Sequence, residues 1–145
     1  SLGAGRMRLA RSFGRITLSM GVAIMTLMAV VMYVFSPALM SVMSPDASVC
    51  CLTVDILRIE ALAEPMFAAS IICYGIFVGA GDTTVPCTMN LASIWGVRIV
   101  LAALLSGSYG LQGVWIAMAI ELTFRGFIFL IRFHSDRWMK GKKIV

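Results

Sequence analysis

The stretch "ITLSMGVAIMTLMAVVMYVF", residues 16–35, decides the fold class of this protein. It holds 20 residues and no charged side chain. A helix of that length rises about 30 Å, which is the thickness of the hydrocarbon core of a bilayer. The composition agrees, because 60% of the 145 residues are hydrophobic and only 13% are charged. A soluble domain of this size carries far more charge, so the sequence predicts an all-α membrane protein.

Turn-rich breaks divide the chain into four apolar spans with basic residues at both ends. Residues 1–15 contain four arginines, and residues 134–145 contain Arg137, Lys140, Lys142 and Lys143, whereas the loops on the other side contain no Lys or Arg. By the positive-inside rule both ends are cytoplasmic, which requires an even number of spans. We predict a multi-pass protein of the inner or plasma membrane, with Tyr109 and Trp138 as interfacial anchors. The four predicted transmembrane helices cover residues 16–35, 54–78, 85–105 and 111–133.

Two connecting segments carry local signals. Residues 1–15 are predicted to be a cytoplasmic connector or, alternatively, a short basic helix on the inner membrane surface. In "GAGDTTVP", Gly79 or Gly81 can end one helix in a left-handed cap. Asp82 or Thr84 can cap the next helix, with Pro86 in its first turn.

Six ionisable side chains lie inside the predicted spans. A charge in hydrocarbon costs several kcal/mol, so such residues usually face a partner or water. Counting along the helices places Glu64, Arg98 and Glu121 at similar depths, about 18–22 Å from the inner ends. Arg98 is therefore expected to neutralise either Glu64 or Glu121, and Arg125 lies one turn from Glu121. The candidates for ion pairs are Arg58, Arg98, Glu121 and Arg125.

Glu60 and Glu64 are the main candidates for binding substrate or protons. They are four residues apart, so their carboxylates share one face of a helix. Two carboxylates in a poorly solvated site cannot both ionise cheaply, and one of them would take up a proton. Pro65 favours a kink beside Glu64. Tyr74 and Met66 are further candidates, and methionines such as Met28 and Met32 would fill core gaps or line an adaptable cavity.

Several classes of function are not expected. No nucleophile, base and orienting group form a catalytic set, so the protein is predicted not to be an enzyme. The four cysteines show no metal-ligand spacing, and neither a metal nor another cofactor is predicted. The net charge of +5 comes from the two ends of the chain, which fits membrane topology better than nucleic-acid binding.

The order and spacing of several motifs resemble the C-terminal end of the multidrug and toxic compound extrusion (MATE) family. The resemblance rests on "RIEALAEPMFAASIICYGIFVGAGDTTVP" (residues 58–86), "NLASIWGVRIVLAALL" (residues 90–105) and "GLQGVWIAMAIELTFRG" (residues 110–126), followed by a basic tail with a tryptophan. The first 15 residues resemble the cytoplasmic loop before the ninth helix of that family. The resemblance covers essentially the whole chain.

The resemblance implies a piece of a larger transporter. Family members have twelve helices in two lobes, and this chain would supply helices nine to twelve, so the missing N-terminal helices would be its main partner. It implies exchange of organic cations for protons or sodium ions, and a water-filled cavity facing Glu60 and Glu64. Some members carry a sodium-binding aspartate shortly after the proline. Phe67, Ala68 and Ala69 stand there in this chain, so Glu64 or the absent lobe would bind the coupling ion.

Two other functions stay open. An autonomous four-span exporter of the small multidrug resistance type would need a glutamate in its first span, and residues 16–35 have none. A non-transporting membrane subunit would use the same ion pairs only to hold its helices together.

Overall fold

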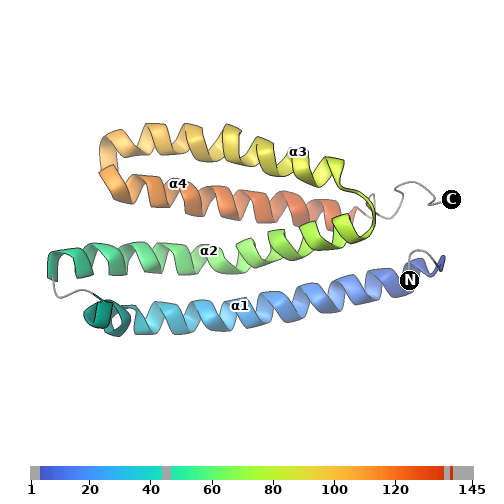
Figure 1. Ribbon diagram of the computed structural model, residues 1–145, viewed down its shortest axis with the longest axis horizontal. Helices are drawn as coiled ribbons and strands as arrows, with labels where there is room; N and C mark the ends of the chain where they lie inside the picture. Colours follow the sequence, from blue (N-terminus) through green and yellow to red (C-terminus); the bar gives the residue numbers. More distant parts are fainter. Residues whose placement is uncertain (1–3, 44–46, 136–137, 139–145) are drawn as a thin grey trace.

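The protein is a bundle of long helices. The computed structural model describes residues 4–43, 47–135 and 138. Within them all regular structure is helical, in the order α1 (Met7–Met43), α2 (Ala47–Gly79), α3 (Thr84–Ser93), the π-helix η1 (Ile94–Ile99) and α4 (Val100–His134). The helix α2 lies between α1 and α4, and α3 lies against the outer side of α4 (Figure 1).

Three helical stretches are long and apolar enough to cross a membrane, namely Met7–Met43, Ser48–Gly79 and Thr84–His134. The third combines α3, η1 and α4, and it is interrupted at Gly110, whose φ of 55° and ψ of −131° are not helical. The chain doubles back within this stretch, so α3 and the later part of α4 run side by side in opposite directions (Figure 1). The predicted all-α membrane class is confirmed, and the number of spans stays a prediction.

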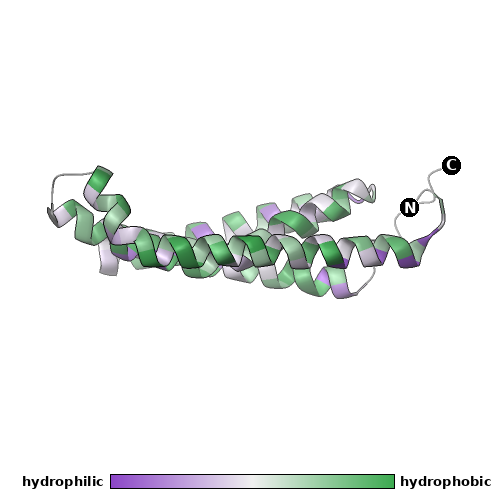
Figure 2. Ribbon diagram, turned by 90° about the horizontal axis from the view of Figure 1, so that it is seen from below, coloured by the Kyte–Doolittle hydropathy of each residue, from purple (hydrophilic) through white to green (hydrophobic). Residues whose placement is uncertain are grey.

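The helix α1 extends beyond the predicted first span at both ends. It takes in residues 7–15, which are continuous with the first span instead of forming a separate helix, and it continues through Pro37. That this segment lies in the cytoplasm stays a prediction. Figure 2 shows α1 as a mostly hydrophobic rod whose hydrophilic residues gather at its N-terminal end. Arginines can occupy the N-terminal end of such an apolar helix because their aliphatic stems lie along it while their charged groups reach water.

The turn between α2 and α3 is set by Gly81. The Asp82 N–H donates to the Phe77 carbonyl and the Gly81 N–H to the Val78 carbonyl, which is the hydrogen-bond pattern of a Schellman motif. Gly81 has φ of +85°, so the left-handed cap falls on this glycine rather than on Gly79. The predicted caps Asp82 and Thr84 are wrong, because Thr83 is the N-cap of α3 and makes no side-chain capping bond.

An aromatic core closes the end of the bundle that holds this turn. Phe77 stacks on Phe129 with ring centroids 5.9 Å apart, and Phe133 stacks on Trp138 at 5.7 Å. Trp138 is 2% exposed and its Nε1 donates to the Phe133 carbonyl at 3.1 Å. Trp138 is thus a core residue, and the interfacial anchor predicted for it is wrong because Phe133 and Phe77 offer an apolar site with a backbone acceptor.

A glycine sets the distance between α2 and α4. A Cβ atom added at Gly126 would lie 2.5 Å from the carbonyl oxygen of Met66, so only glycine allows this approach. Small residues at helix contacts are common in membrane proteins, since close backbone packing replaces the hydrophobic effect there. Phe67 and Arg125 adjoin Met66 and Gly126 in sequence, and the Arg125 guanidinium lies over the Phe67 ring beside this contact.

Candidate functional site

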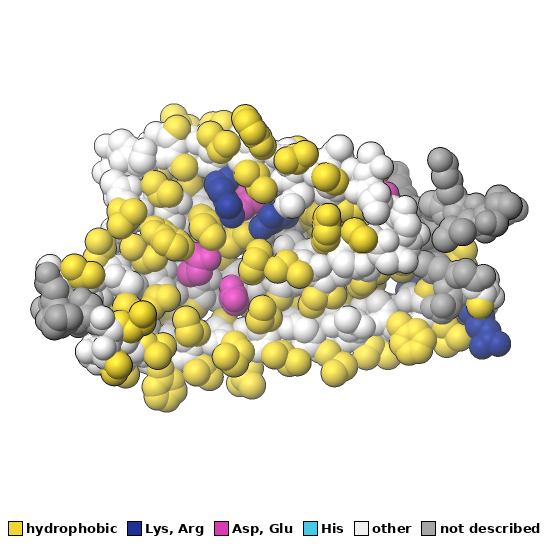
Figure 3. Space-filling model, viewed as in Figure 1, with side chains coloured by type: hydrophobic (Ala, Val, Ile, Leu, Met, Phe, Trp, Pro, Cys, Tyr) yellow, Lys and Arg dark blue, Asp and Glu magenta, His cyan; other side chains and the backbone are white. Residues whose placement is uncertain are grey.

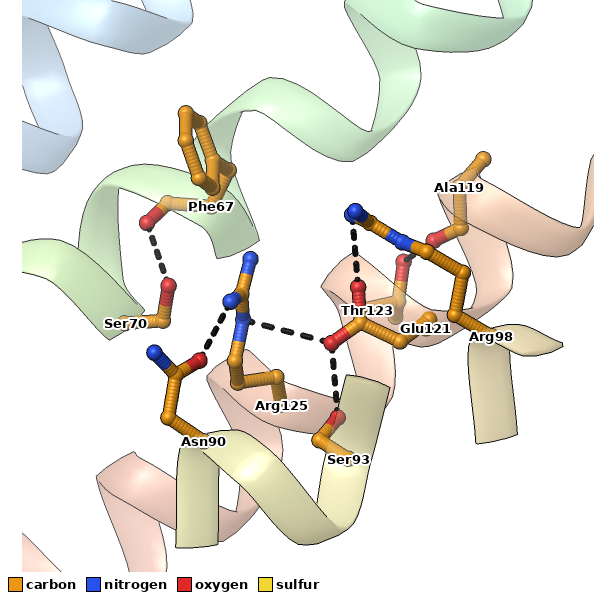
Figure 4. A network of polar contacts seen from close by, with 9 residues as sticks. All are labelled: Phe67, Ser70, Asn90, Ser93, Arg98, Ala119, Glu121, Thr123 and Arg125. Atoms are coloured by element: carbon orange, nitrogen blue, oxygen red, sulfur yellow. Dashed lines mark hydrogen bonds and ion pairs between the residues drawn. The ribbon is translucent and has the colours of Figure 1, made fainter. Parts of the chain in front are cut away.

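Glu121 is the centre of a buried polar cluster, and its side chain is 0% exposed. The hydroxyl of Ser93 donates to Oε1 at 2.7 Å, and Nη2 of Arg98 donates to Oε2 at 2.9 Å. Arg125, one turn further along α4, places its Nε 3.4 Å from Oε1. Each carboxylate oxygen therefore has at least one partner, as Figure 4 shows.

The π-helix η1 allows two of these partners to reach one carboxylate. Ser93 immediately precedes η1 and Arg98 lies five residues later, within it. In an α-helix, residues five apart point about 140° away from each other. The i→i+5 hydrogen bonding of a π-helix brings such residues to nearly the same face, and π-turns of this kind recur at functional sites.

Arg125 links the cluster to two other helices. Its Nη1 donates to Oδ1 of Asn90 on α3 at 2.6 Å, and its guanidinium lies 5.7 Å from the ring centroid of Phe67 on α2. The cluster thus ties together α2, α3, η1 and α4. We refer to the following set as the Glu121 cluster: Asn90, Ser93, Arg98, Glu121 and Arg125.

The Glu121 cluster holds two guanidinium groups and one carboxylate, so it carries an excess of positive charge. Arg98 is the less enclosed of the two, with 31% of its side chain exposed against 12% for Arg125. Arg98 also interacts electrostatically with Glu60 on α2. Arg98 is therefore the link between this cluster and the acidic residues of α2.

Glu60 and Glu64 form a second, separate group, the Glu60–Glu64 pair. Both line a small cavity of about 90 Å³ between α1 and α2. Among the residues that the structure describes, no hydrogen bond or ion pair reaches either carboxylate, and Oε2 of Glu60 is buried without a partner. The remaining lining residues are Met28, Ala29, Met32, Leu57 and Ala61.

A larger apolar cavity of about 290 Å³ adjoins this one, and Ala29 and Ala61 line both. The ring of Tyr33 contributes to its wall, and the guanidinium of Arg58 lies 5.3 Å from the centroid of that ring. Arg58 makes no ion pair within the described part of the chain, and its Nε is buried without a hydrogen bond. The structure thus places Arg58 over an aromatic face, and within the described residues it gives the Glu60–Glu64 pair no hydrogen bond or ion pair.

The two charged groups open onto the same side of the molecule. Figure 3 shows acidic side chains over α2 and basic side chains beside α3 and α4 on one face, surrounded by hydrophobic atoms. This face would be costly to expose to lipid, since ionised groups in hydrocarbon need partners or water.

The other two candidates lie away from the Glu60–Glu64 pair. Met66 packs against α4, because a Cβ added at Gly126 would lie 3.0 Å from the Cβ of Met66. Tyr74 lies 6.4 Å from Phe129, ring centroid to ring centroid, and lines a cavity of about 120 Å³ with Asn90 and Arg125. Tyr74 is therefore a neighbour of the Glu121 cluster.

Sequence reasoning missed three polar partners. Ser93 and Asn90 carry no charge, and a lone serine or asparagine in an apolar helix gives no signal of what it binds. An ion pair between Asp82 and Arg132 was also missed, because Asp82 was interpreted as a helix cap. A signal did exist for it, since both residues fall at the same end of neighbouring predicted spans.

Within residues 4–43, 47–135 and 138, no group of three or more His, Cys, Asp or Glu side chains is placed to hold a metal ion. None of the four cysteines forms a disulfide bond, and of the four only Cys73 is buried, while Cys51 and Cys87 are exposed. The site chemistry that the described residues offer is thus that of carboxylates, guanidiniums and apolar walls.

The long apolar helices and the buried charges define a multi-pass membrane protein. The family model described as MatE matches residues 1–104 of the chain. The chain therefore belongs to the MatE family, which is the family predicted from the sequence motifs.

Proteins similar to this chain carry names of transporters. One is "Probable multidrug resistance protein NorM" of Deinococcus radiodurans, 30% identical over 138 residues, which are 90% of this chain and 31% of that protein. Another is "Uncharacterized transporter YisQ" of Bacillus subtilis, 26% identical over 124 residues, which are 84% of this chain and 27% of that protein. This chain spans less than a third of the length of these relatives. No solved structure is a significant match.

Proposed function

We propose that the chain forms part of a secondary active exporter that exchanges organic cations or drugs for protons or sodium ions. The observation that carries this proposal is the Glu60–Glu64 pair, two carboxylates that make no hydrogen bond or ion pair with the described residues and line a small cavity between α1 and α2. The structural role of neutralising Arg98 is taken by Glu121. The Glu60–Glu64 pair therefore remains available to bind a cation.

The pair suits an exchange of ions. Glu60 and Glu64 interact electrostatically with each other, and like charges in a poorly solvated site favour uptake of a proton by one of them. A proton, a sodium ion or a cationic substrate would each relieve the same repulsion. Competition among these cations for one pair of carboxylates is the simplest basis for exchange.

The walls around the pair suit amphipathic cations. Met28 and Met32 line the small cavity, and the adjoining cavity of about 290 Å³ is mostly apolar. Methionine side chains are flexible and polarisable, so they adapt to ligands of different shape. The names of the relatives, which refer to multidrug resistance, support this substrate class.

The proposal includes a membrane topology. The four spans within residues 16–35, 54–78, 85–105 and 111–133 would cross the inner or plasma membrane with both ends in the cytoplasm. The arginines in the first turns of α1 support this orientation. Further helices of the same protein, in a twelve-helix arrangement of two lobes, would cover the face that holds the charged groups and complete the cavity.

Replacing Glu64 with glutamine in the complete protein tests the proposal. We expect Glu64→Gln to reduce efflux of a cationic dye to near the level of cells that lack the protein, because the neutral amide cannot exchange a proton or bind a cation strongly. The measurement is dye efflux from cells, with protein abundance and membrane insertion determined in parallel.

Asp55→Asn is the matched control for that experiment. Asp55 lies on the same helix, nine residues before Glu64, and is exposed. The same loss of charge there should leave efflux unchanged. Normal efflux by Glu64→Gln would contradict the proposal, and loss of insertion without a specific loss of efflux would favour the membrane scaffold.

A further inference from the structure

A basic cavity lies between the start of α1 and the end of α4. It measures about 100 Å³ and is lined by Arg11, Arg15, Phe133 and His134. Arg11 and Arg15 are one helical turn apart, so both side chains leave α1 on the same face. The cavity is thus bounded on one side by two guanidiniums and on the other by an imidazole and an aromatic ring.

Gly14 brings the two helices close enough to form this cavity. A Cβ added at Gly14 would lie 3.1 Å from the ring of Phe133, so the ring packs directly against the backbone of α1. Arg11 and Arg15 stand on either side of Gly14 in sequence. The cavity therefore lies beside this close contact, and Arg11 and Arg15 line it from α1.

The lining contains no carboxylate among the described residues. Asp82, at the same end of the bundle, forms an ion pair with Arg132. Arg132 also lies over the Phe77 ring at 5.6 Å, so it is held away from this cavity. Arg11 takes part in a further interaction as well, whereas Arg15 and His134 are exposed side chains that line the cavity.

We propose that this cavity binds the phosphate of an anionic phospholipid headgroup. Guanidinium groups match phosphate oxygens with several N–H donors at once. Basic cavities between transmembrane helices at the cytoplasmic surface are suited to such headgroups. The helix α1 also exposes apolar side chains, including Phe13, Ile16 and Met20, as a helix in contact with lipid does. The inference rests on the membrane placement in the proposed function but not on transport.

The test measures lipid binding by the complete protein in detergent. The protein is titrated with phosphatidylglycerol or phosphatidylcholine, and the thermal midpoint is followed. We expect phosphatidylglycerol to stabilise the protein and Arg15→Gln to weaken its apparent affinity about fivefold, which corresponds to about 1 kcal/mol for one basic residue near an anionic surface. Arg15→Lys should keep most of the affinity, and His134→Gln should weaken it.

Two control variants distinguish binding in this cavity from non-specific attraction of anionic lipid to the basic residues of α1. Arg8 is exposed on α1 and does not line the cavity, so Arg8→Gln should bind phosphatidylglycerol normally. Glu64→Gln should also bind it normally, which keeps this test independent of transport. Equal weakening by Arg8→Gln and Arg15→Gln would overturn the proposal. So would displacement of phosphatidylglycerol by low concentrations of inorganic phosphate, which would indicate a soluble phosphate ligand.

Discussion

Replacing Glu121 with glutamine is expected to destabilise the protein more than any other single loss of charge. The change leaves Arg98 and Arg125 beside a neutral side chain in a site where Glu121 was 0% exposed. Breaking a buried ion pair by removing one partner costs on the order of 3–5 kcal/mol, because the remaining charge is uncompensated. The measurement is the thermal midpoint of the complete protein in detergent, followed by the fraction that stays monodisperse after heating.

Glu60→Gln provides the matched control for this prediction. It makes the same chemical change at a glutamate that has no hydrogen-bond or ion-pair partner among the described residues. Its thermal midpoint should stay near that of the unchanged protein or rise, since Oε2 of Glu60 is buried without a hydrogen bond and Glu64 repels the carboxylate. Adding Arg98→Gln to Glu121→Gln should recover part of the loss. Equal midpoints for Glu121→Gln and Glu60→Gln would contradict the structural role of the Glu121 cluster.

Gly126→Ala should separate α2 from α4. The added methyl group would lie 2.5 Å from the carbonyl oxygen of Met66, and a backbone atom cannot move aside as a side-chain end can. Overpacking of this kind typically costs about 1–3 kcal/mol. We expect a lower thermal midpoint and, because the contact positions Arg125 opposite Phe67, reduced efflux as well.

Gly75→Ala is the control for the packing prediction. Gly75 lies within α2, and a Cβ there would meet nothing within 4 Å in the described structure. Alanine favours a helix over glycine by about 1 kcal/mol, so this change should be neutral or stabilising. A similar drop in midpoint for both variants would show that the α2–α4 distance is not set by Gly126.

The helices themselves could be predicted well from the sequence, because a long apolar run has few alternatives to a helix. The ends could not be predicted as well. Residues 7–15 continue α1, since nothing in "MRLARSFGR" stops a helix and arginine tolerates a position at the membrane surface. The break around Gly110 was visible in "SGSYG", where small and flexible residues interrupt the apolar pattern.

The charged residues could be found from the sequence, but their partners could not be assigned. Counting placed Glu64 and Glu121 at similar depths and left both as partners for Arg98. The choice between them depends on the rotation of each helix about its axis and on η1, whose extra residue per turn has no sequence signal. The structure pairs Arg98 with Glu121, and it places Glu64 in the cavity that faces α1.

The Glu121 cluster and the Glu60–Glu64 pair differ in how their charges are paired. The Glu121 cluster joins four helical segments through paired charges, which is the arrangement expected of a structural element. The Glu60–Glu64 pair makes no hydrogen bond or ion pair within the described residues and lies beside apolar cavity walls that include two methionines. The proposed cation binding rests on this arrangement, in which the Glu121 cluster holds the helices and the two carboxylates of α2 make no ion pair with the described residues.

The most direct test of the proposed exchange uses vesicles that contain only the complete protein and an imposed ion gradient. The vesicles are loaded with a cationic dye, and its release is followed under an inward proton gradient, an inward sodium gradient, or neither. We predict gradient-dependent release by the unchanged protein and by Asp55→Asn, and none by Glu64→Gln. Release that persists after both gradients are collapsed, or that is the same in Glu64→Gln, would contradict exchange at this carboxylate pair.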